Sequence, residues 1–289
     1  MGKVAVVTDS TAILPDDLGA AGELITVVPL QVIIDAEAHE DGTPETSPEA
    51  ITVALSAKRQ VSTSRPAPAL FAEVYADLAA RGYTEVVSIH LSGEMSATVE
   101  SAQIAAGSAP IPVTTLDTRA VGPCVGFAVL AAATAILGGA DAATAVANAR
   151  ARAEATRSFF YVDTLEFLRR GGRIGPAAAL LGSALAVKPL LAIEDGQVVV
   201  HERVRTAARA LGRLEELAVD FAGDQRVEVV VAHLGAADRA GALVEHLDER
   251  LAAGLESRSV RCVELGAALA AHVGPGLLAV VVSPALDPG

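Results

Sequence analysis

Short apolar runs alternate with helical patterns over residues 1–160, and this alternation constrains the fold more than any other feature of the sequence. The apolar runs predict strands at Val4–Val7, Val86–Ile89 and Val113–Leu116, and a longer extended run at Ile25–Ile34 that is interrupted at Pro29. The segments between and after them predict helices at Pro48–Lys58, Pro68–Arg81, Ser96–Ala106, Val121–Leu137 and Ala142–Arg157. Strands that alternate with helices form parallel, doubly wound sheets. We therefore expect an N-terminal α/β domain over residues 1–160.

The second part of the chain has a different pattern. The apolar runs Leu190–Ile193 and Val198–Val200 flank Asp195-Gly196, a dipeptide preferred in two-residue hairpin turns. Further elements are predicted as helices at Arg205–Phe221 and Asp238–Leu251, and as strands at Val227–His233, Val260–Glu264 and Leu277–Val282. A hairpin followed by mixed elements predicts a C-terminal α+β domain with a mainly antiparallel sheet over residues 161–289.

Composition narrows the class of protein. The chain has 289 residues, 52% of them hydrophobic but only 3% aromatic, so its core must be built from aliphatic side chains. The formal net charge is −13. Non-specific nucleic-acid binding needs a basic surface, so we expect no nucleic-acid partner.

Short or interrupted apolar stretches favour a cytoplasmic protein. The N-terminal apolar run ends at Asp9 and is too short for a signal peptide. Two longer uncharged stretches, Ala120–Ala140 and Leu265–Leu286, contain glycine and proline and fit a buried helix or a helix–turn–strand better than a membrane span. Cys124 and Cys262 lack metal-ligand spacing and are typical of reduced thiols. We expect at most transient membrane contact, no metal and no cofactor.

Hydroxyl and acidic residues gather where predicted strands end. They lie in Thr8–Thr11, Ser62–Arg65, His90–Thr98 and Asp117–Arg119, each before a predicted helix. Loops at the carboxyl ends of parallel strands share one edge of a sheet, and helix N-termini there favour an anion. Ordinary helix N-capping is the alternative, since Ser, Thr and Asp are preferred caps. Walker and Rossmann glycine patterns are missing from the sequence, so a nucleotide is not the favoured ligand.

The segment Asp163–Gly175 combines three arginines with a double glycine. Arg169 and Arg170 suit the last turn of a short helix, and Gly171-Gly172 can take the left-handed angles that end it. Arg173 would then be a cation held in place for an acidic ligand. A polar loop at His39-Glu40-Asp41-Gly42 is predicted to be solvated rather than a metal site.

A histidine precedes a second glycine-rich turn, Gly274-Pro275-Gly276. His272 could donate a hydrogen bond to a ligand carboxylate, or it could be purely structural.

Seven motifs together resemble those of the DegV family of bacterial fatty-acid-binding proteins, in the same order. They are Val7–Pro15, Ser62–Pro68, Ser92–Ala102, Asp163–Gly175, Lys188–Leu191, Val204–Thr206 and His272–Gly276. The resemblance implies two α/β domains that hold a long-chain fatty acid between them. It also implies that some members are the binding subunit of a fatty acid kinase. In those members a separate ATP-dependent subunit phosphorylates the carboxylate to an acyl phosphate, which feeds phospholipid synthesis.

The resemblance also implies a set of carboxylate-binding residues. Thr63, Ser92 and Ser96 would surround the carboxylate from the first domain, and Arg173, His272 and Arg205 would approach it from the second.

The sequence departs from the family pattern at three positions. Gly93 replaces the second serine of the usual pair, Arg65 the usual glutamine and Ala97 the usual glycine. These departures concern the details of the carboxylate site and the choice of ligand.

The leading hypothesis is therefore a lipid-binding protein without catalysis of its own, which presents a fatty acid to a partner kinase. One alternative is a serine-dependent acyl hydrolase or acyltransferase that uses Ser96 or Ser10 with His272, although the sequence has no Gly-x-Ser-x-Gly elbow. The other is a carrier of a different acidic small molecule.

Overall fold

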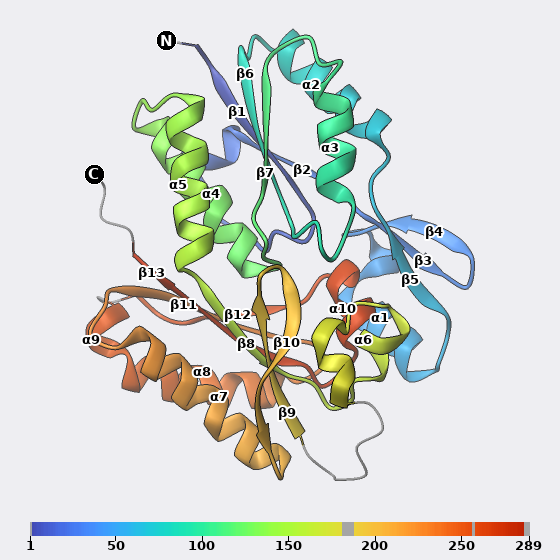
Figure 1. Cartoon of the computed structure of the whole chain (residues 1–289), viewed down its shortest axis with the longest axis vertical. Helices are drawn as coiled ribbons and strands as arrows, with labels where there is room; N and C mark the ends of the chain where they lie inside the picture. The colour runs from blue at the N-terminus through green and yellow to red at the C-terminus, as the bar shows by residue number, and fades with distance from the viewer. Residues whose placement is uncertain (1, 181–187, 256–257, 286–289) are drawn as a thin grey trace. The chain divides into compact units, whose positions relative to one another are not determined.

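The computed structural model describes residues 2–180, 188–255 and 258–285 (Figure 1). It divides into two compact units, of which unit 1 comprises Met1–Gln31 and Thr63–Glu154, and unit 2 comprises Val32–Ser62 and Ala155–Gly289. The sequence-based boundaries assign residues 32–62 to the first domain, whereas the contacts assign them to unit 2. The reason is that helix α1 (Pro48–Ser56) packs against helix α10 (Ala267–Val273).

Unit 1 is built on a four-stranded parallel sheet, as the sequence predicts. The strand order is β2 (Ile25–Val28), β1 (Val4–Asp9), β6 (Glu85–His90) and β7 (Val113–Asp117). The helices are α2 (Pro68–Ala80), α3 (Thr98–Ala106), α4 (Pro123–Leu137) and α5 (Ala142–Ala155). Helices α2 and α3 lie on one side of the sheet, and α4 and α5 on the other (Figure 1). Every residue of β1 is buried because both faces of a doubly wound sheet are covered.

Unit 2 contains a six-stranded, mainly antiparallel sheet, which confirms the predicted fold class. The strand order is β10 (Gln197–Val204), β9 (Lys188–Glu194), β8 (Arg157–Tyr161), β13 (Leu278–Pro284), β11 (Val227–His233) and β12 (Arg261–Glu264). Only the β11–β12 pair is parallel among these neighbours in the described residues. The predicted hairpin turn is present, and Asp195 and Gly196 both have positive φ, at 48° and 81°, as a type I′ turn requires.

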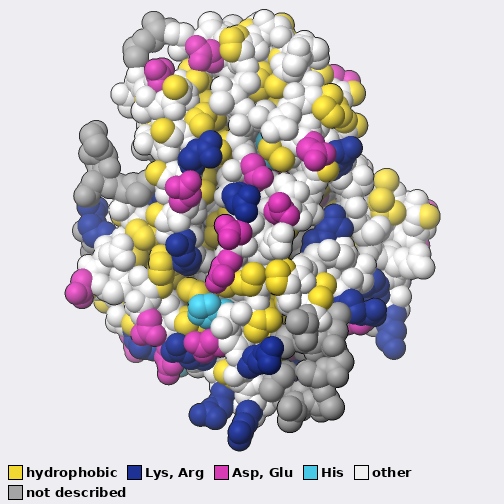
Figure 2. Space-filling model, in the orientation of Figure 1, with side chains coloured by type: hydrophobic (Ala, Val, Ile, Leu, Met, Phe, Trp, Pro, Cys, Tyr) yellow, Lys and Arg dark blue, Asp and Glu magenta, His cyan; other side chains and the backbone are white. Residues whose placement is uncertain are grey.

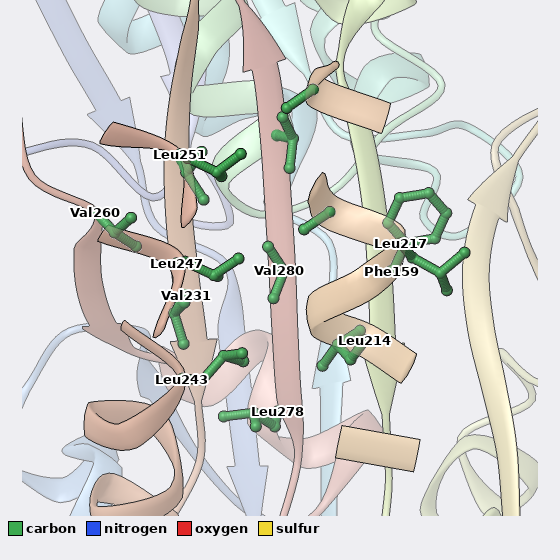
Figure 3. Packing of buried hydrophobic residues seen from close by; sticks show 14 of the residues in the cluster. Phe159, Leu214, Leu217, Val231, Leu243, Leu247, Leu251, Val260, Leu278 and Val280 are labelled. Atoms are coloured by element: carbon green, nitrogen blue, oxygen red, sulfur yellow. The ribbon is translucent and has the colours of Figure 1, made fainter. Parts of the chain in front are cut away.

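Two long helices of unit 2, α7 (Ala207–Ala222) and α8 (Ala237–Arg250), pack on this sheet with an almost purely aliphatic interface. Leu214 and Leu217 of α7 and Leu243 and Leu247 of α8 face strand residues such as Val280 (Figure 3). A separate three-stranded sheet has the strand order β4 (Glu37–Glu40), β3 (Gln31–Ile34) and β5 (Val61–Ser64). The short helices are α6 (Glu166–Arg170) and α9 (Ala252–Leu255).

The extended run Ile25–Ile34, predicted to be interrupted at Pro29, is two strands, because Pro29 has no N–H to donate to a ladder. Two other predictions about individual elements are wrong. His39 and Glu40, predicted to lie in a loop, belong to β4. The helix predicted to reach Arg157 ends at Ala155, and strand β8 begins at Arg157.

The visible face carries both acidic and basic side chains among hydrophobic and uncharged ones (Figure 2). Within the described ranges, no helix combines the length and apolar character needed to cross a bilayer.

Candidate functional site

The carboxyl ends of β1, β6 and β7 bring three of the predicted polar loops to one edge of the sheet in unit 1 (Figure 1). The prediction that the segment Ser62–Arg65 also lies at this edge is wrong. Val61–Ser64 forms β5 of the separate three-stranded sheet. Because β5 belongs to another sheet, the parallel sheet does not bring Thr63 to this edge.

Arg65 nevertheless connects the segment of Thr63 to the start of α3. Its Nη1 donates to the carbonyl of Ala97 at 3.3 Å and lies 3.2 Å from Oε2 of Glu100. The ion pair is exposed, and such pairs contribute little to stability. Its consequence is geometric, because it brings the residues next to Thr63 toward the loop that carries Ser96. Arg65, which replaces the glutamine usual in the family, therefore links the segment of Thr63 to the loop of Ser96.

The hydroxyls at the sheet edge are not helix caps. The N-cap residues of α2, α3 and α4 are Ala67, Ala97 and Gly122, and none of them caps its helix with a side chain. The N-capping alternative is therefore wrong for these three helices. The hydroxyls instead hold loops together: Ser92 Oγ accepts from the N–H of Glu94 at 3.2 Å.

Ser96 and Ser10 make comparable local contacts. Ser96 Oγ lies 2.8 Å from Oγ1 of Thr98, and Ser10 Oγ accepts from the N–H of Leu30 at 3.1 Å. Ser92 is fully buried, whereas Ser96 and Thr63 are partly buried. All of these side chains belong to unit 1.

Gly93 allows Asp117 to approach the backbone of this edge. The N–H of Gly93 donates to Oδ2 of Asp117 at 3.1 Å, and a Cβ at position 93 would lie only 2.9 Å from the same oxygen. A serine there, as in the family pattern, would require Asp117 to move. The glycine that removes one hydroxyl therefore also makes room for the Asp117 carboxylate, which extends from the end of β7 and binds the loop after β6.

A buried hydrogen-bonded chain beneath this edge was not foreseen from the sequence. It joins Asp9 Oδ2 to His90 Nδ1 at 2.9 Å, His90 Nε2 to Ser88 Oγ at 2.7 Å, and Ser88 Oγ to the hydroxyl of Tyr75 at 2.8 Å. A Ser-His-Asp order of this kind occurs in serine hydrolases. Here Ser88 is 0% exposed and shared with Tyr75, whose pKa burial raises to about 12. The Ser88 hydroxyl lies within strand β6 and is held between His90 and Tyr75, so we interpret the chain as structural rather than as a nucleophilic triad.

In unit 2, the turn after α6 positions Arg173. The helix ends at Arg170, as the sequence predicts, and the N–H of Arg173 donates to the carbonyl of Leu168 at 2.9 Å. Nη1 of Arg173 donates to the carbonyl of Gly171 at 2.6 Å. Gly172 has the expected left-handed φ of +69°, but the expectation is wrong for Gly171, whose φ is −74°.

Gly171 is required by packing rather than by its backbone angles. A Cβ at this position would collide with Nδ1 of His272 and lie 3.1 Å from its Cε1. The imidazole of His272 therefore rests directly on the turn that carries Arg173. The two residues that the family resemblance pairs are neighbours within unit 2.

Two further glycines allow close packing between the Gly-Pro-Gly turn and the Asp163–Gly175 segment. A Cβ at Gly274 would collide with the ring of Phe167, and a Cβ at Gly276 would collide with the carboxylate of Asp163. Both glycines have positive φ, at +74° and +90°. The Gly-Pro-Gly turn and the Asp163–Gly175 segment therefore approach each other so closely that only glycine fits.

The pKa of His272 is lowered to about 4, chiefly by burial and further by the charge of Arg173. At neutral pH the imidazole is therefore neutral. It can supply a hydrogen bond to a ligand, while the positive charge of this pair belongs to Arg173.

This shift predicts a specific pH dependence of stability. The unfolded chain binds a proton at His272 near pH 6.5, and the folded chain only near pH 4. Stability is therefore fully present above pH 6.5 and falls by about 3 kcal/mol by pH 4. The difference in unfolding free energy between the wild type and His272→Gln, measured in urea from pH 7 to pH 4, should change by that amount. Parallel curves would contradict the shift.

Three further arginines of unit 2 stand out in the sequence, at positions 169, 170 and 205. Arg169 forms an exposed ion pair with Glu166, Nη2 to Oε1 at 2.7 Å, and Arg170 lies over the ring of Phe167. Arg205 is exposed between β10 and α7. The helix predicted to begin there starts at Ala207, after a Thr206 cap.

A second polar group around Asp163 was also missed. Arg239 donates to the carbonyl of Gly276 at 3.1 Å and lies 3.6 Å from Oδ1 of Asp163, and Lys188 donates to the carbonyl of Asp163 at 3.1 Å. Burial, and then Asp163, raise the pKa of Tyr161 to about 12. The start of the arginine–glycine motif at Asp163 was the only sequence signal for this group. No three His, Cys, Asp or Glu side chains in the described part of the chain are arranged to hold a metal ion.

The comparisons with known proteins agree on one family. Residues 3–285 match a family described as uncharacterised proteins of the DegV family. A DegV domain-containing protein of Streptomyces coelicolor is 50% identical over 282 residues, which cover 97% of this chain and 98% of that protein.

Solved structures extend the similarity to the fold. A Thermus thermophilus DegV family protein, described by its fatty acid binding, is 34% identical with a TM-score of 0.88 and covers 98% of this chain and 100% of its own. A Bacillus subtilis DegV, described as a fatty acid binding protein, is 28% identical with a TM-score of 0.88, over 99% of this chain and 100% of its own. This chain belongs to the DegV family.

Proposed function

We propose that this protein binds a long-chain fatty acid and holds its carboxylate with hydroxyl, imidazole and guanidinium side chains. One observation carries the proposal: the match over nearly the whole chain, with a TM-score of 0.88, to a protein described by its fatty acid binding. The same protein is 34% identical to this chain. We propose Thr63, Ser92 and Ser96 from unit 1 as ligands of the carboxylate, and from unit 2 Arg173, His272 and Arg205.

The chemistry of these groups fits a carboxylate. A buried carboxylate that lacks partners is strongly unfavourable, and a cation with several hydrogen-bond donors offsets that penalty. Because His272 is neutral at pH 7, the charge must come from arginine, and Arg173 is fixed by its own turn. The hydroxyls and the imidazole would then supply neutral hydrogen bonds.

The decisive experiment is mass spectrometry of lipid extracted from the purified protein, followed by titration with laurate, myristate, palmitate and stearate. A buried methylene contributes about 0.8 kcal/mol, so Kd should fall about fourfold for each added methylene until the site is full. A carrier of another acidic molecule would show no such increment. The absence of both extracted lipid and uptake of added palmitate would refute the proposal.

We further propose that the protein has no catalytic activity of its own and presents the bound carboxylate to a separate ATP-dependent kinase in the cytoplasm. The sequence supports this because it contains no Walker loop that would cradle a nucleotide. The test is acyl-phosphate formation in a mixture of the loaded protein, ATP and a candidate kinase. The hydrolase alternative predicts turnover of acyl esters that Ser96→Ala abolishes.

A further inference from the structure

Two loops at the sheet edge of unit 1 are tied together by the side chain of Asp9, which is 0% exposed. Its Oδ1 accepts from the N–H of Thr11 at 3.1 Å and from the hydroxyl of Thr11 at 2.5 Å. Its Oδ2 accepts from the N–H of Leu91 at 3.1 Å and contacts Nδ1 of His90 at 2.9 Å. One carboxylate thus fixes the loop after β1 and the loop after β6.

His90 extends this connection to the loop after β7. Its carbonyl accepts from both the N–H and the hydroxyl of Thr118, at 3.1 and 2.8 Å. Two residues beyond His90, the N–H of Ser92 donates to the carbonyl of Ala120 at 2.8 Å. The backbone before Ser92 is therefore held by Asp9, and that of Ser92 itself by the neighbouring loop.

The ring of His90 is held in one orientation. Oδ2 of Asp9 accepts from the N–H of Leu91, and we assign Nδ1 of His90 as a second donor to the same oxygen. Nε2 faces Ser88, and the ring of Phe71 packs edge-on against the imidazole with centroids 5.1 Å apart. These contacts leave His90 buried, with its side chain and its carbonyl both engaged in fixing the loop that carries Ser92.

We propose that Asp9 and His90 are positioning residues for Ser92, and that they act on the carboxylate of the ligand only through that hydroxyl. The inference rests on the proposed function. Its physical basis is that a donor held in advance does not lose conformational freedom when the ligand binds. Asp9 and His90 bond to each other and to the three loops, and Ser92 lies within the region that those bonds fix.

The test compares His90→Leu with His90→Asn. The amide nitrogen of asparagine takes nearly the place of Nδ1 and keeps the donor to Asp9, whereas leucine removes it. Calorimetric titration with palmitate should give a Kd about tenfold or more higher for His90→Leu, with a stoichiometry of one. His90→Asn should stay within about threefold of the wild type. Binding of hexadecanol, which has the same chain but no carboxylate, should be unchanged in both.

Two outcomes separate positioning from a merely structural role. In the background of Ser92→Ala, adding His90→Leu should cause no further loss of palmitate affinity. Additive losses, or equal losses for palmitate and hexadecanol, would overturn the inference. If His90→Leu does not fold, Asp9→Asn is the alternative variant. It turns an acceptor that faces Leu91 into a donor, and it should give the same selective loss of palmitate affinity. An unchanged ratio of the Kd values for palmitate and hexadecanol would overturn the inference. A wild type that binds no palmitate would refute the proposed function itself.

Discussion

Replacing Gly274 with alanine is expected to lower the free energy of unfolding by about 2–6 kcal/mol. The residue has a φ of +74° and a ψ of 168°, a combination adopted almost only by glycine, at which an L side chain adds about 1–3 kcal/mol of strain. Its new Cβ would also lie 2.7 Å from Cγ of Phe167 and closer still to Cδ2 and Cε2 of that ring. Overpacking of this kind adds about 1–3 kcal/mol. Urea unfolding at pH 7 measures the loss.

Gly172→Ala is the matched control for this prediction. Gly172 has a similar φ of +69°, but no atom lies within 4 Å of the position that its Cβ would take. This variant should lose only the backbone contribution of about 1 kcal/mol. Equal losses in the two variants would show that the contact between Gly274 and Phe167 does not constrain the turn.

The difference between these two glycines shows where sequence reasoning stops. The composition of the Asp163–Gly175 segment predicted a short helix, a glycine turn and a fixed arginine, and all three are present. It could not show that Gly171, Gly274 and Gly276 are required by side chains more than a hundred positions away. Those requirements arise from tertiary packing, which a local pattern does not encode.

The fold shows the same limit. Long apolar runs and amphipathic helices predicted the parallel sheet of unit 1 and the hairpin of unit 2, because burial imposes their periodicity. Strands β4 and β5 were missed because Glu37–Glu40 and Val61–Ser64 are short and largely polar, and only their pairing makes them strands. In the site, the loops were predicted, but the link from Asp9 to His90 spans 81 positions and has no sequence signature.

Replacing Arg173 with glutamine is expected to raise the Kd for palmitate about a hundredfold. A charge-assisted hydrogen bond contributes about 1.5–3 kcal/mol, and each 1.4 kcal/mol changes affinity tenfold. The loss should be large because His272 is neutral at pH 7 and cannot replace the missing charge. Isothermal titration with palmitate measures the change, and hexadecanol, which carries no charge, should bind both proteins equally.

Arg169→Gln is the matched control, since Arg169 lies four residues earlier and pairs with Glu166 in an exposed contact. It should leave palmitate binding unchanged.

A second measurement tests whether Arg173 lies beside His272. Its charge is one cause of the low pKa of His272, so an NMR titration of Arg173→Gln should show that pKa moving from about 4 toward 6.5, although burial keeps it below that value. Unchanged palmitate affinity together with a raised pKa of His272 would leave Arg173 beside the imidazole but remove it from the ligand site.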